Sequence, residues 1–352
     1  MKKVAIGFIT LLVVLLVVLA GIAGVSLSTQ VGQNFLLNRI AALFVREGAT
    51  ALPDSESLRV FVCGSASPLG VTDRAQACIA VLTPEHFFIV DSGAGSTDNL
   101  NRGRLPMARL QGIFITHFHS DHIAELYEVN LNSWVQGRTE QLVVYGPEGV
   151  ERVTEAVNEG YALDREYRVA HHGEALLKPV LGELVPETLE PGVVFDDGAL
   201  KITLYTGDHP PIVPAAGYRF DYQGRSVVIS GDSLVTDETR RIVAGADLLL
   251  HDALSESIVS TLSGAAGEAG LDRISKVMSD VMDYHASTTS LVTLADSTNV
   301  DMVALYHLVP APVNSVIEKI FESGLPSNYL LADDGMWFEL PLGSDDIVVA
   351  GP

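Results

Sequence analysis

Four side chains that can bind metal ions lie in one short run, His117-Phe118-His119-Ser120-Asp121-His122. The run follows residues 112–116, an apolar segment with the pattern of a buried strand. Side chains alternate along extended backbone, so His117 and His119 are expected to point the same way. Asp121 and His122 fall where the chain turns into a predicted helix, which directs them elsewhere. Two pairs with different directions favour a centre for two metal ions.

Later in the chain, three more metal-binding side chains each follow an apolar strand pattern: His209 after 200–205, Asp232 after 226–229 and His307 after 301–306. Residues beyond the carboxyl ends of strands often gather at the active site of α/β folds. Imidazole and carboxylate ligands without thiolate suit zinc, manganese or iron, and zinc is the most frequent of these. The seven residues therefore predict two divalent metal ions, most often Zn²⁺.

The composition is acidic: 22 lysines and arginines stand against 44 aspartates and glutamates, and the formal net charge of the 352 residues is −22. A nucleic-acid-binding protein needs a basic footprint to displace counterions from phosphates, and the body of this chain has no basic run. Nucleic acid is therefore an unlikely partner by composition. With only two cysteines, a disulfide-rich scaffold and a cysteine-based zinc module are excluded.

From residue 58 onward, short apolar strand patterns alternate with helical ones, and close strand pairs near 86–91 and 225–230 suggest hairpins. This mixture predicts one α/β domain over 58–352. The longest helix predicted within this domain covers 122–136. The polar, Pro/Gly-punctuated segment 161–199 is interpreted as an insertion.

The N-terminus carries Lys2 and Lys3, and residues 4–25 contain no charge. At about 1.5 Å per residue this segment can cross a hydrocarbon core of about 30 Å. The positive-inside rule then places the rest of the chain outside the cytoplasm. We expect a signal anchor over 1–28, an amphipathic stem and linker over 29–57, and a membrane-anchored, extracytoplasmic domain. The alternative is a signal peptide cleaved near 20–24, which would give a secreted protein.

Taken together, the H-x-H-x-D-H run, the later histidine, a Gly-Asp-Ser aspartate and the final histidine resemble the metallo-β-lactamase superfamily. Five further motifs resemble its ribonuclease Z and arylsulfatase-like branch: Gly64-Ser65-Ala66-Ser67-Pro68, Asp91-Ser92-Gly93-Ala94-Gly95, His209 with Gly217-Tyr218-Arg219, His251-Asp252-Ala253 and His285-Ala286-Ser287-Thr288. The resemblance implies a four-layer αβ/βα sandwich with the metals at one edge, between the two sheets.

The resemblance also implies how the ligands divide. His117, His119 and His209 would hold one metal, Asp121, His122 and His307 the other, and Asp232 would bridge them. Enzymes of this superfamily that act on β-lactams often have a cysteine near the bridging position. This chain has Ser230-Gly231-Asp232 there, which argues against that activity.

Three departures from the ribonuclease Z pattern are visible. The usual Gly-Asp-Thr-Arg-Pro is Gly231-Asp232-Ser233-Leu234-Val235 here, and the usual His-Glu-Ala is His251-Asp252-Ala253. The insertion 161–199 is rich in acidic residues, where the family has a basic arm that holds tRNA. The acidic composition of 161–199 argues against a grip on a phosphate backbone by that segment.

The expected chemistry is hydrolysis by a hydroxide shared between two metals, which also polarise the oxygens of the scissile group. Asp121 would bind metal and orient or deprotonate the attacking water. His285, oriented by Asp252, is the predicted proton donor to the leaving group. His285 could instead be a helix-capping or surface histidine, and Asp252 could fix a ligating histidine.

These features favour a membrane-anchored dinuclear zinc hydrolase that acts on small-molecule phosphodiester or sulfate esters. A lactonase or other carboxyl-ester hydrolase is the alternative enzyme, and a metal-binding regulatory module is the alternative without catalysis. A homodimer is a further hypothesis.

Cys63 and Cys78 flank the segment 64–77. If their strands pair antiparallel, the two sulfurs could form a disulfide. Two buried thiols are the alternative.

Overall fold

The computed structural model describes residues 24, 27–48, 56–70 and 72–352, which form two units divided between Pro53 and Asp54. In the first unit, helix α2 (Gln30–Gly48) exposes apolar side chains that include Val31 and Phe35. The expected membrane span, residues 4–25, lies outside the described residues except for residue 24. None of the helices in the described part of the chain is long and apolar enough to cross a membrane. The fold prediction is therefore corrected: the membrane-spanning helix is not supported, whereas the sandwich is.

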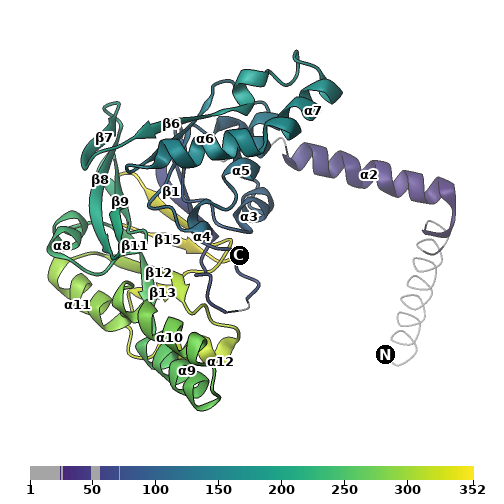
Figure 1. Ribbon diagram of the computed structural model, residues 1–352. Helices are drawn as coiled ribbons and strands as arrows, with labels where there is room; N and C mark the ends of the chain where they lie inside the picture. Colours follow the sequence, from purple (N-terminus) through teal and green to yellow (C-terminus); the bar gives the residue numbers. More distant parts are fainter. Residues whose placement is uncertain (1–23, 25–26, 49–55, 71) are drawn as a thin grey trace, which may run out of the picture. The chain divides into compact units, whose positions relative to one another are not determined.

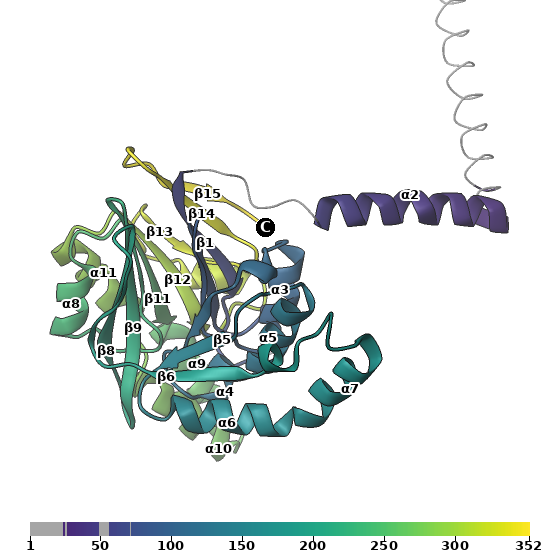
Figure 2. The same ribbon diagram turned by 90° about the horizontal axis from the view of Figure 1, so that it is seen from above.

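The second unit is built on two sheets (Figure 1; Figure 2). In the described residues the first sheet has eight strands in the order β15-β14-β1-β2-β3-β4-β5-β6. Strands β3 to β6 run parallel, and the pairs on the other side of β3 are antiparallel. The strands are β1 (Ser57–Gly64), β2 (Cys78–Leu82), β3 (Phe87–Val90), β4 (Gly112–Phe114), β5 (Leu142–Gly146), β6 (Leu184–Thr188), β14 (Trp337–Pro341) and β15 (Val348–Ala350).

The second sheet has seven strands in the described part of the chain, in the order β13-β12-β11-β10-β9-β8-β7. Strands β10 to β13 are parallel, and β7 to β10 are joined antiparallel. The strands are β7 (Gly192–Asp196), β8 (Leu200–His209), β9 (Ile212–Tyr222), β10 (Arg225–Ile229), β11 (Leu248–Leu254), β12 (Met302–Val309) and β13 (Tyr329–Leu331).

The main core lies between the two sheets because both inner faces carry large apolar side chains. Phe114 of β4 meets Tyr218 of β9 with ring centroids 5.0 Å apart, and Val60 and Ile229 belong to the same buried cluster. A second apolar cluster fills the space between the outer face of β11 and β12 and helices α8 (Asp237–Val243), α11 (Thr288–Thr298) and α12 (Ser315–Phe321).

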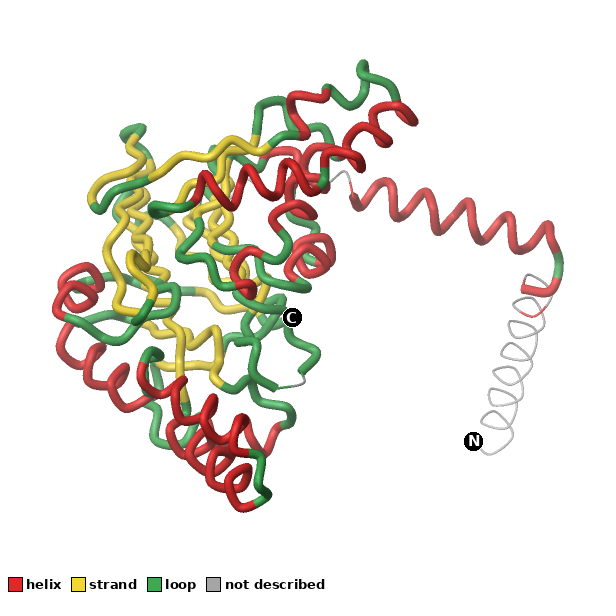
Figure 3. Tube along the Cα trace, in the orientation of Figure 1, coloured by secondary structure: helices red, strands yellow, loops and turns green. Residues whose placement is uncertain are grey.

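Helices also cover the outer face of the first sheet, with strands inside and helices outside (Figure 3). They are α3 (Ser96–Arg102), α4 (Ser120–Ile123), α5 (Leu126–Val135) and α6 (Val150–Gly160). This arrangement confirms the αβ/βα sandwich of the sequence prediction. The segment 161–199 contains α7 (Ala162–His172), the short turn Pro179–Gly182 and strands β6 and β7.

The helix predicted over 122–136 is in fact two helices, α4 and α5, separated at residues 124–125. The loop after β3 explains the break. The Glu125 backbone N–H donates to the Ser92 carbonyl, and the Glu125 carboxylate accepts from the backbone N–H groups of Gly95 (2.6 Å) and Thr97 (2.7 Å). These contacts fix Glu125 outside the helical path.

A disulfide joins Cys63 of β1 to Cys78 of β2, and the two strands pair antiparallel with Gly64 opposite Cys78. Of the two alternatives that the sequence left open, a disulfide and two buried thiols, the structure contains the disulfide. It fastens the loop 64–77, which lies next to the metal-binding side chains through Ser67.

Candidate metal centre

The H-x-H-x-D-H run leaves the end of β4 and enters the single turn of α4. His119 is the extended residue that precedes the helix (φ −64°, ψ 149°), and Asp121 and His122 lie in the helical turn. The change from extended to helical backbone therefore separates the two pairs of candidate ligands. All but His119 of these four side chains are buried.

The first cluster contains His117, His119, His209 and Asp232, which each bring one ligand atom within 4.8 Å of the others. His117 Nε2 lies 2.9 Å from His119 Nδ1, and His209 Nε2 lies 3.4 Å from the same atom. Burial lowers the pKa of each of the three histidines, most strongly that of His117. Neutral imidazoles are favoured, and these are the form that binds metal.

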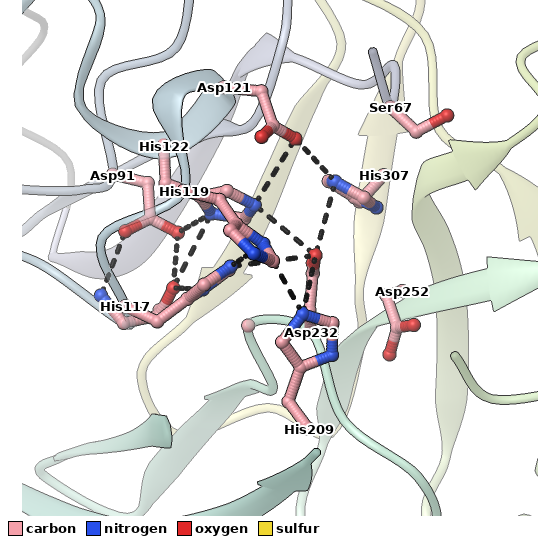
Figure 4. A network of polar contacts seen from close by, with 12 residues as sticks. Ser67, Asp91, His117, His119, Asp121, His122, His209, Asp232, Asp252 and His307 are labelled. Atoms are coloured by element: carbon pink, nitrogen blue, oxygen red, sulfur yellow. Dashed lines mark hydrogen bonds and ion pairs between the residues drawn. The ribbon is translucent and has the colours of Figure 1, made fainter. Parts of the chain in front are cut away.

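The second cluster contains Asp121, His122, Asp232 and His307 (Figure 4). His307 Nε2 lies 3.0 Å from Asp121 Oδ2 and 3.4 Å from Asp232 Oδ2, and His122 Nε2 lies 3.3 Å from Asp232 Oδ2. Asp232 belongs to both clusters, so its carboxylate lies where a bridging ligand would be needed.

Two buried atoms at the centre of the clusters fit a metal ion. Asp232 Oδ1 and His122 Nε2 are buried and make no hydrogen bond among the described residues. Burying a carboxylate oxygen without a partner is costly, and a divalent cation removes that cost. Burial alone would raise the pKa of Asp232, but the surrounding histidines, His307 foremost, hold it well below its usual range. Asp232 is therefore a carboxylate that is ready to bind a cation.

The backbone at Gly231 shapes the bridging position. Its φ is +63°, and a Cβ there would lie 2.7 Å from Thr116 Cβ and 2.8 Å from the carbonyl oxygen of Ala216. Only glycine fits both the left-handed backbone and the close approach. The Gly-Asp pair thus brings Asp232 between the two sheets.

Residues behind the ligands hold the histidine rings. Asp91 Oδ2 lies 2.7 Å from His122 Nδ1, and both Asp91 oxygens accept hydrogen bonds from Thr116 (2.8 Å each). The backbone carbonyl of Tyr284 lies 2.9 Å from His209 Nδ1. Each contact occupies Nδ1 and leaves Nε2 for the cluster. Sequence reasoning did not assign Asp91 this role, although its Asp-Ser-Gly motif at the end of a strand marks the position.

Asp252 and His285 lie together at the edge of the centre. His285 Nδ1 is 3.0 Å from Asp252 Oδ2 and 3.9 Å from Asp232 Oδ2, and the other Asp252 oxygen is 2.8 Å from His251 Nδ1. Asp252 is completely buried, and His285 lines the pocket in front of the clusters. Asp232, Asp252 and His285 could also hold a cation together, so the geometry allows His285 either role.

The remaining histidines are elsewhere in the fold. His171 and His172 end α7, and His86 bonds to Asp197 Oδ2 at 2.8 Å and to Thr83 Oγ1 at 2.7 Å.

Residues 87–308 match the model of a protein family described as the beta-lactamase superfamily domain. Ribonuclease Z of Mycobacterium bovis (strain BCG / Pasteur 1173P2) is 31% identical over 257 residues, which cover 72% of this chain and 87% of that protein. The chain belongs to the metallo-β-lactamase superfamily, in its ribonuclease Z branch. Ribonuclease Z of Mycolicibacterium paratuberculosis (strain ATCC BAA-968 / K-10) is 30% identical over 73% of this chain and 88% of its own length.

Solved structures share the superfamily fold. The short form of human tRNase Z aligns with a TM-score of 0.58 at 18% identity, covering 80% of this chain and 99% of its own. The metallo-beta-lactamase fold protein YhfI from Bacillus subtilis aligns with a TM-score of 0.57 at 17% identity, covering 81% and 99%. The protein is thus a metal-dependent hydrolase of the superfamily, and its clusters indicate divalent metal ions.

The family corrects the prediction about partners. Net charge made nucleic acid an unlikely partner, but the curated relatives are ribonucleases, which argues against a small-molecule ester as the substrate. Net charge sums the whole chain, whereas an enzyme contacts its substrate through a local surface. The sulfate-ester and arylsulfatase-like parts of the prediction have no support among these relatives.

The predicted location is corrected as well. The membrane-anchored, extracytoplasmic enzyme and its secreted alternative rested on Lys2, Lys3 and the uncharged residues 4–25. No described helix can span a membrane, and the relatives in the ribonuclease Z branch give no support for an anchor. The prediction is withdrawn.

Proposed function

We propose that this protein is a phosphodiesterase that cleaves RNA with the help of two divalent metal ions, and that these ions are zinc. One combined observation supports the proposal. Seven candidate ligands form two clusters that share Asp232, and the chain belongs to the ribonuclease Z branch. Lewis acidity and activation of water are what a pair of metal ions supplies at such a centre. His117, His119 and His209 would hold one ion, Asp121, His122 and His307 the other, and Asp232 both.

Asp121 is proposed to act on the attacking water besides binding metal. It is only 5% exposed, yet it lines the pocket, and its Oδ2 faces His307. Burial alone would raise the pKa of Asp121, but His122, with Nε2 3.5 Å from Asp121 Oδ2, and the hydrogen bond from His307 outweigh burial and lower it, so Asp121 is a carboxylate at neutral pH. A carboxylate in this position can accept a hydrogen bond from water and orient it toward the phosphorus.

His285 is proposed to protonate the leaving oxygen. Asp252 accepts the hydrogen bond from His285 Nδ1 and would stabilise the imidazolium form of the ring, whose Nε2–H is the proton that could be donated. Asp252 is itself held by the backbone N–H groups of Ser233 and Ala286 at 3.2 Å. The pair therefore has a fixed orientation at the pocket wall.

The test uses the full-length, metal-loaded protein with an RNA oligonucleotide and bis(p-nitrophenyl) phosphate. We expect both to be hydrolysed, and p-nitrophenyl sulfate and a lactone to be hydrolysed far more slowly. The variant His117→Ala, purified in the same way, controls for contaminating ribonuclease because it lacks a ligand of the first cluster. Faster turnover of the sulfate or the lactone than of either phosphodiester would overturn the proposal.

A further inference from the structure

The pocket in front of the metal clusters has two chemically different walls. Its volume is about 270 Å³. One wall consists of imidazoles and carboxylates, and the other is apolar, formed by Pro68, Leu69, Val277, Val281 and Tyr284. Pockets that enclose a complete small ligand measure about 300–1,000 Å³. This one is smaller, so it encloses only the part of an RNA chain nearest the scissile bond.

The apolar wall is a packed surface. Leu69, Met278 and Tyr284 pack against a buried cluster of Leu254, Val259, Val281 and Val309. The wall is contributed by the loop after β1, by helix α10 (Asp272–Asp280) and by the turn Val281–Asp283. Helix α9 (Glu256–Glu268) precedes α10 in the chain and supplies Val259. Because several elements hold it, the wall presents a fixed apolar surface to the substrate.

Tyr284 brings an aromatic ring next to the metal ligands. Its ring meets that of His209 edge to face, with centroids 5.0 Å apart and planes at 87°, and it lies 4.8 Å from the ring of His285. Its backbone carbonyl binds His209 Nδ1, which ties the position of the residue to the first cluster. The side chain is only partly buried and lines the pocket.

The charges of the residues that line the pocket increase the expected contribution of the Tyr284 ring to nucleotide binding. Among the described residues that line the pocket there is no lysine or arginine, whereas Asp121 and Asp232 are both present. Beyond the metal ions, a nucleotide bound here therefore gains little from electrostatic attraction. Stacking of a base on an aromatic ring contributes without a charge on the protein, and it accepts every base because each has a flat face.

We infer that Tyr284, with Leu69 and Val277 beside it, binds the nucleobase next to the scissile phosphate. Tyr284 would then determine specificity for nucleotides over other phosphate esters, and it would do so without sequence preference. The inference rests on the proposed cleavage of RNA.

The role of Tyr284 is tested by calorimetry, which measures the affinity of the full-length, metal-loaded protein for two small molecules. Adenosine 5′-monophosphate carries a base and ribose 5-phosphate does not, while both carry the same phosphate. We expect the native protein to prefer the nucleotide by about 5- to 150-fold, the range that corresponds to about 1–3 kcal/mol of stacking. Tyr284→Phe keeps the ring and should keep this ratio, whereas Tyr284→Leu should bring it close to one.

Tyr167→Leu is the matched control, because Tyr167 is an exposed tyrosine (58%) on α7 and does not line the pocket. Metal content is measured in each variant. If Tyr284→Leu loses metal, Val277→Ser replaces it, since Val277 is 43% exposed and can change without disturbing the core. This variant should also lower the ratio, by a smaller factor.

The outcomes separate this inference from the proposed function. A ratio near one in the native protein, or an unchanged ratio in Tyr284→Leu with its metals retained, rejects the role of Tyr284. Turnover of RNA decides the proposed function independently, because the binding ratio does not require catalysis.

Discussion

Asp91 Oδ2 accepts a hydrogen bond from His122 Nδ1 at 2.7 Å, which turns His122 Nε2 toward Asp232 at 3.3 Å. Asp91 has a left-handed backbone (φ 59°) at the end of β3, and His122 lies in α4. Burial would lower the pKa of His122, but the carboxylates of Asp232 and Asp91 raise it well above its usual value. Asp91 therefore controls both the orientation and the basicity of a candidate metal ligand.

Replacing Asp91 should weaken metal binding although Asp91 is not a ligand. Loss of such an outer partner typically reduces metal affinity about 10- to 100-fold. We expect this for Asp91→Asn, measured by competition with a chromophoric chelator. Asp98→Asn, at an exposed position in α3, is the control and should bind metal normally. Normal affinity in Asp91→Asn would show that Thr116 and the backbone alone hold His122.

Elemental analysis of the full-length protein should find close to two divalent metal ions per chain, because the clusters form two groups that share Asp232. His307→Ala removes a ligand of the second group only, so its content should fall to about one. His171→Ala, an exposed histidine on α7, should keep both ions. A content that does not change in His307→Ala would refute the two-site assignment.

His285→Ala should keep both metal ions and slow substrates with poor leaving groups. General acid catalysis contributes about 10²- to 10⁴-fold, and we expect a loss in that range on RNA or an alkyl phosphodiester. Bis(p-nitrophenyl) phosphate should be affected much less, since its leaving group needs little protonation. Equal losses on both substrates would remove His285 from the acid role, and loss of a metal would make it a ligand. Asp121→Ala is expected to weaken metal binding and to slow both substrates together.

The contact between Asp197 and His86 should make stability depend on pH. Hydrogen bonds from the backbone N–H groups of Leu200 and Ala199 and from His86 lower the pKa of Asp197 from 3.8 to about 2. A lowered pKa in the folded state stabilises the protein above pH 4, and this contribution is lost as the pH falls from about 4 to about 2. The side chain is 41% exposed, so screening keeps the effect below about 1 kcal/mol.

We therefore expect Asp197→Asn to lower the Tm at pH 6 and to differ less from the native protein at pH 3. Asp196→Asn, one residue away, is the control, because among the described residues that side chain bonds only to the Gly198 N–H. A Tm difference that stays constant over this pH range would argue against the ionic contribution of Asp197.

The disulfide between Cys63 and Cys78 should stabilise the fold by closing a loop with a sequence separation of 15. Loop closure of this length corresponds to about 3 kcal/mol in the unfolded chain. We expect the double variant Cys63→Ala/Cys78→Ala to lose free energy of unfolding of about this size. Thiol labelling of the unfolded, unreduced protein should find no free thiol, and two free thiols would reject the bridge.

The sequence by itself determined the residue types of the candidate ligands in the H-x-H-x-D-H run and their division into two pairs. His117, His119, Asp121 and His122 are neighbours in the chain, so the change from strand to helical turn alone decides their directions. The alternation of strands and helices likewise determined an α/β domain. In contrast, helix 122–136 was predicted as one piece, because the contacts that interrupt it at Glu125 come from the loop after β3.

The sequence also named His209, Asp232 and His307 as candidate ligands, but only the tertiary structure decided that these distant residues meet the H-x-H-x-D-H run. His209 lies 90 positions from its neighbour His119, and His307 lies 186 positions from Asp121, so their meeting depends on the order and register of strands in two sheets. The roles of Asp91 and Tyr284 follow from the same packing, because neither residue type indicates a partner by itself. Net charge did not indicate the ribonuclease relatives, since it sums the whole chain and contains no information about the residues that line the site.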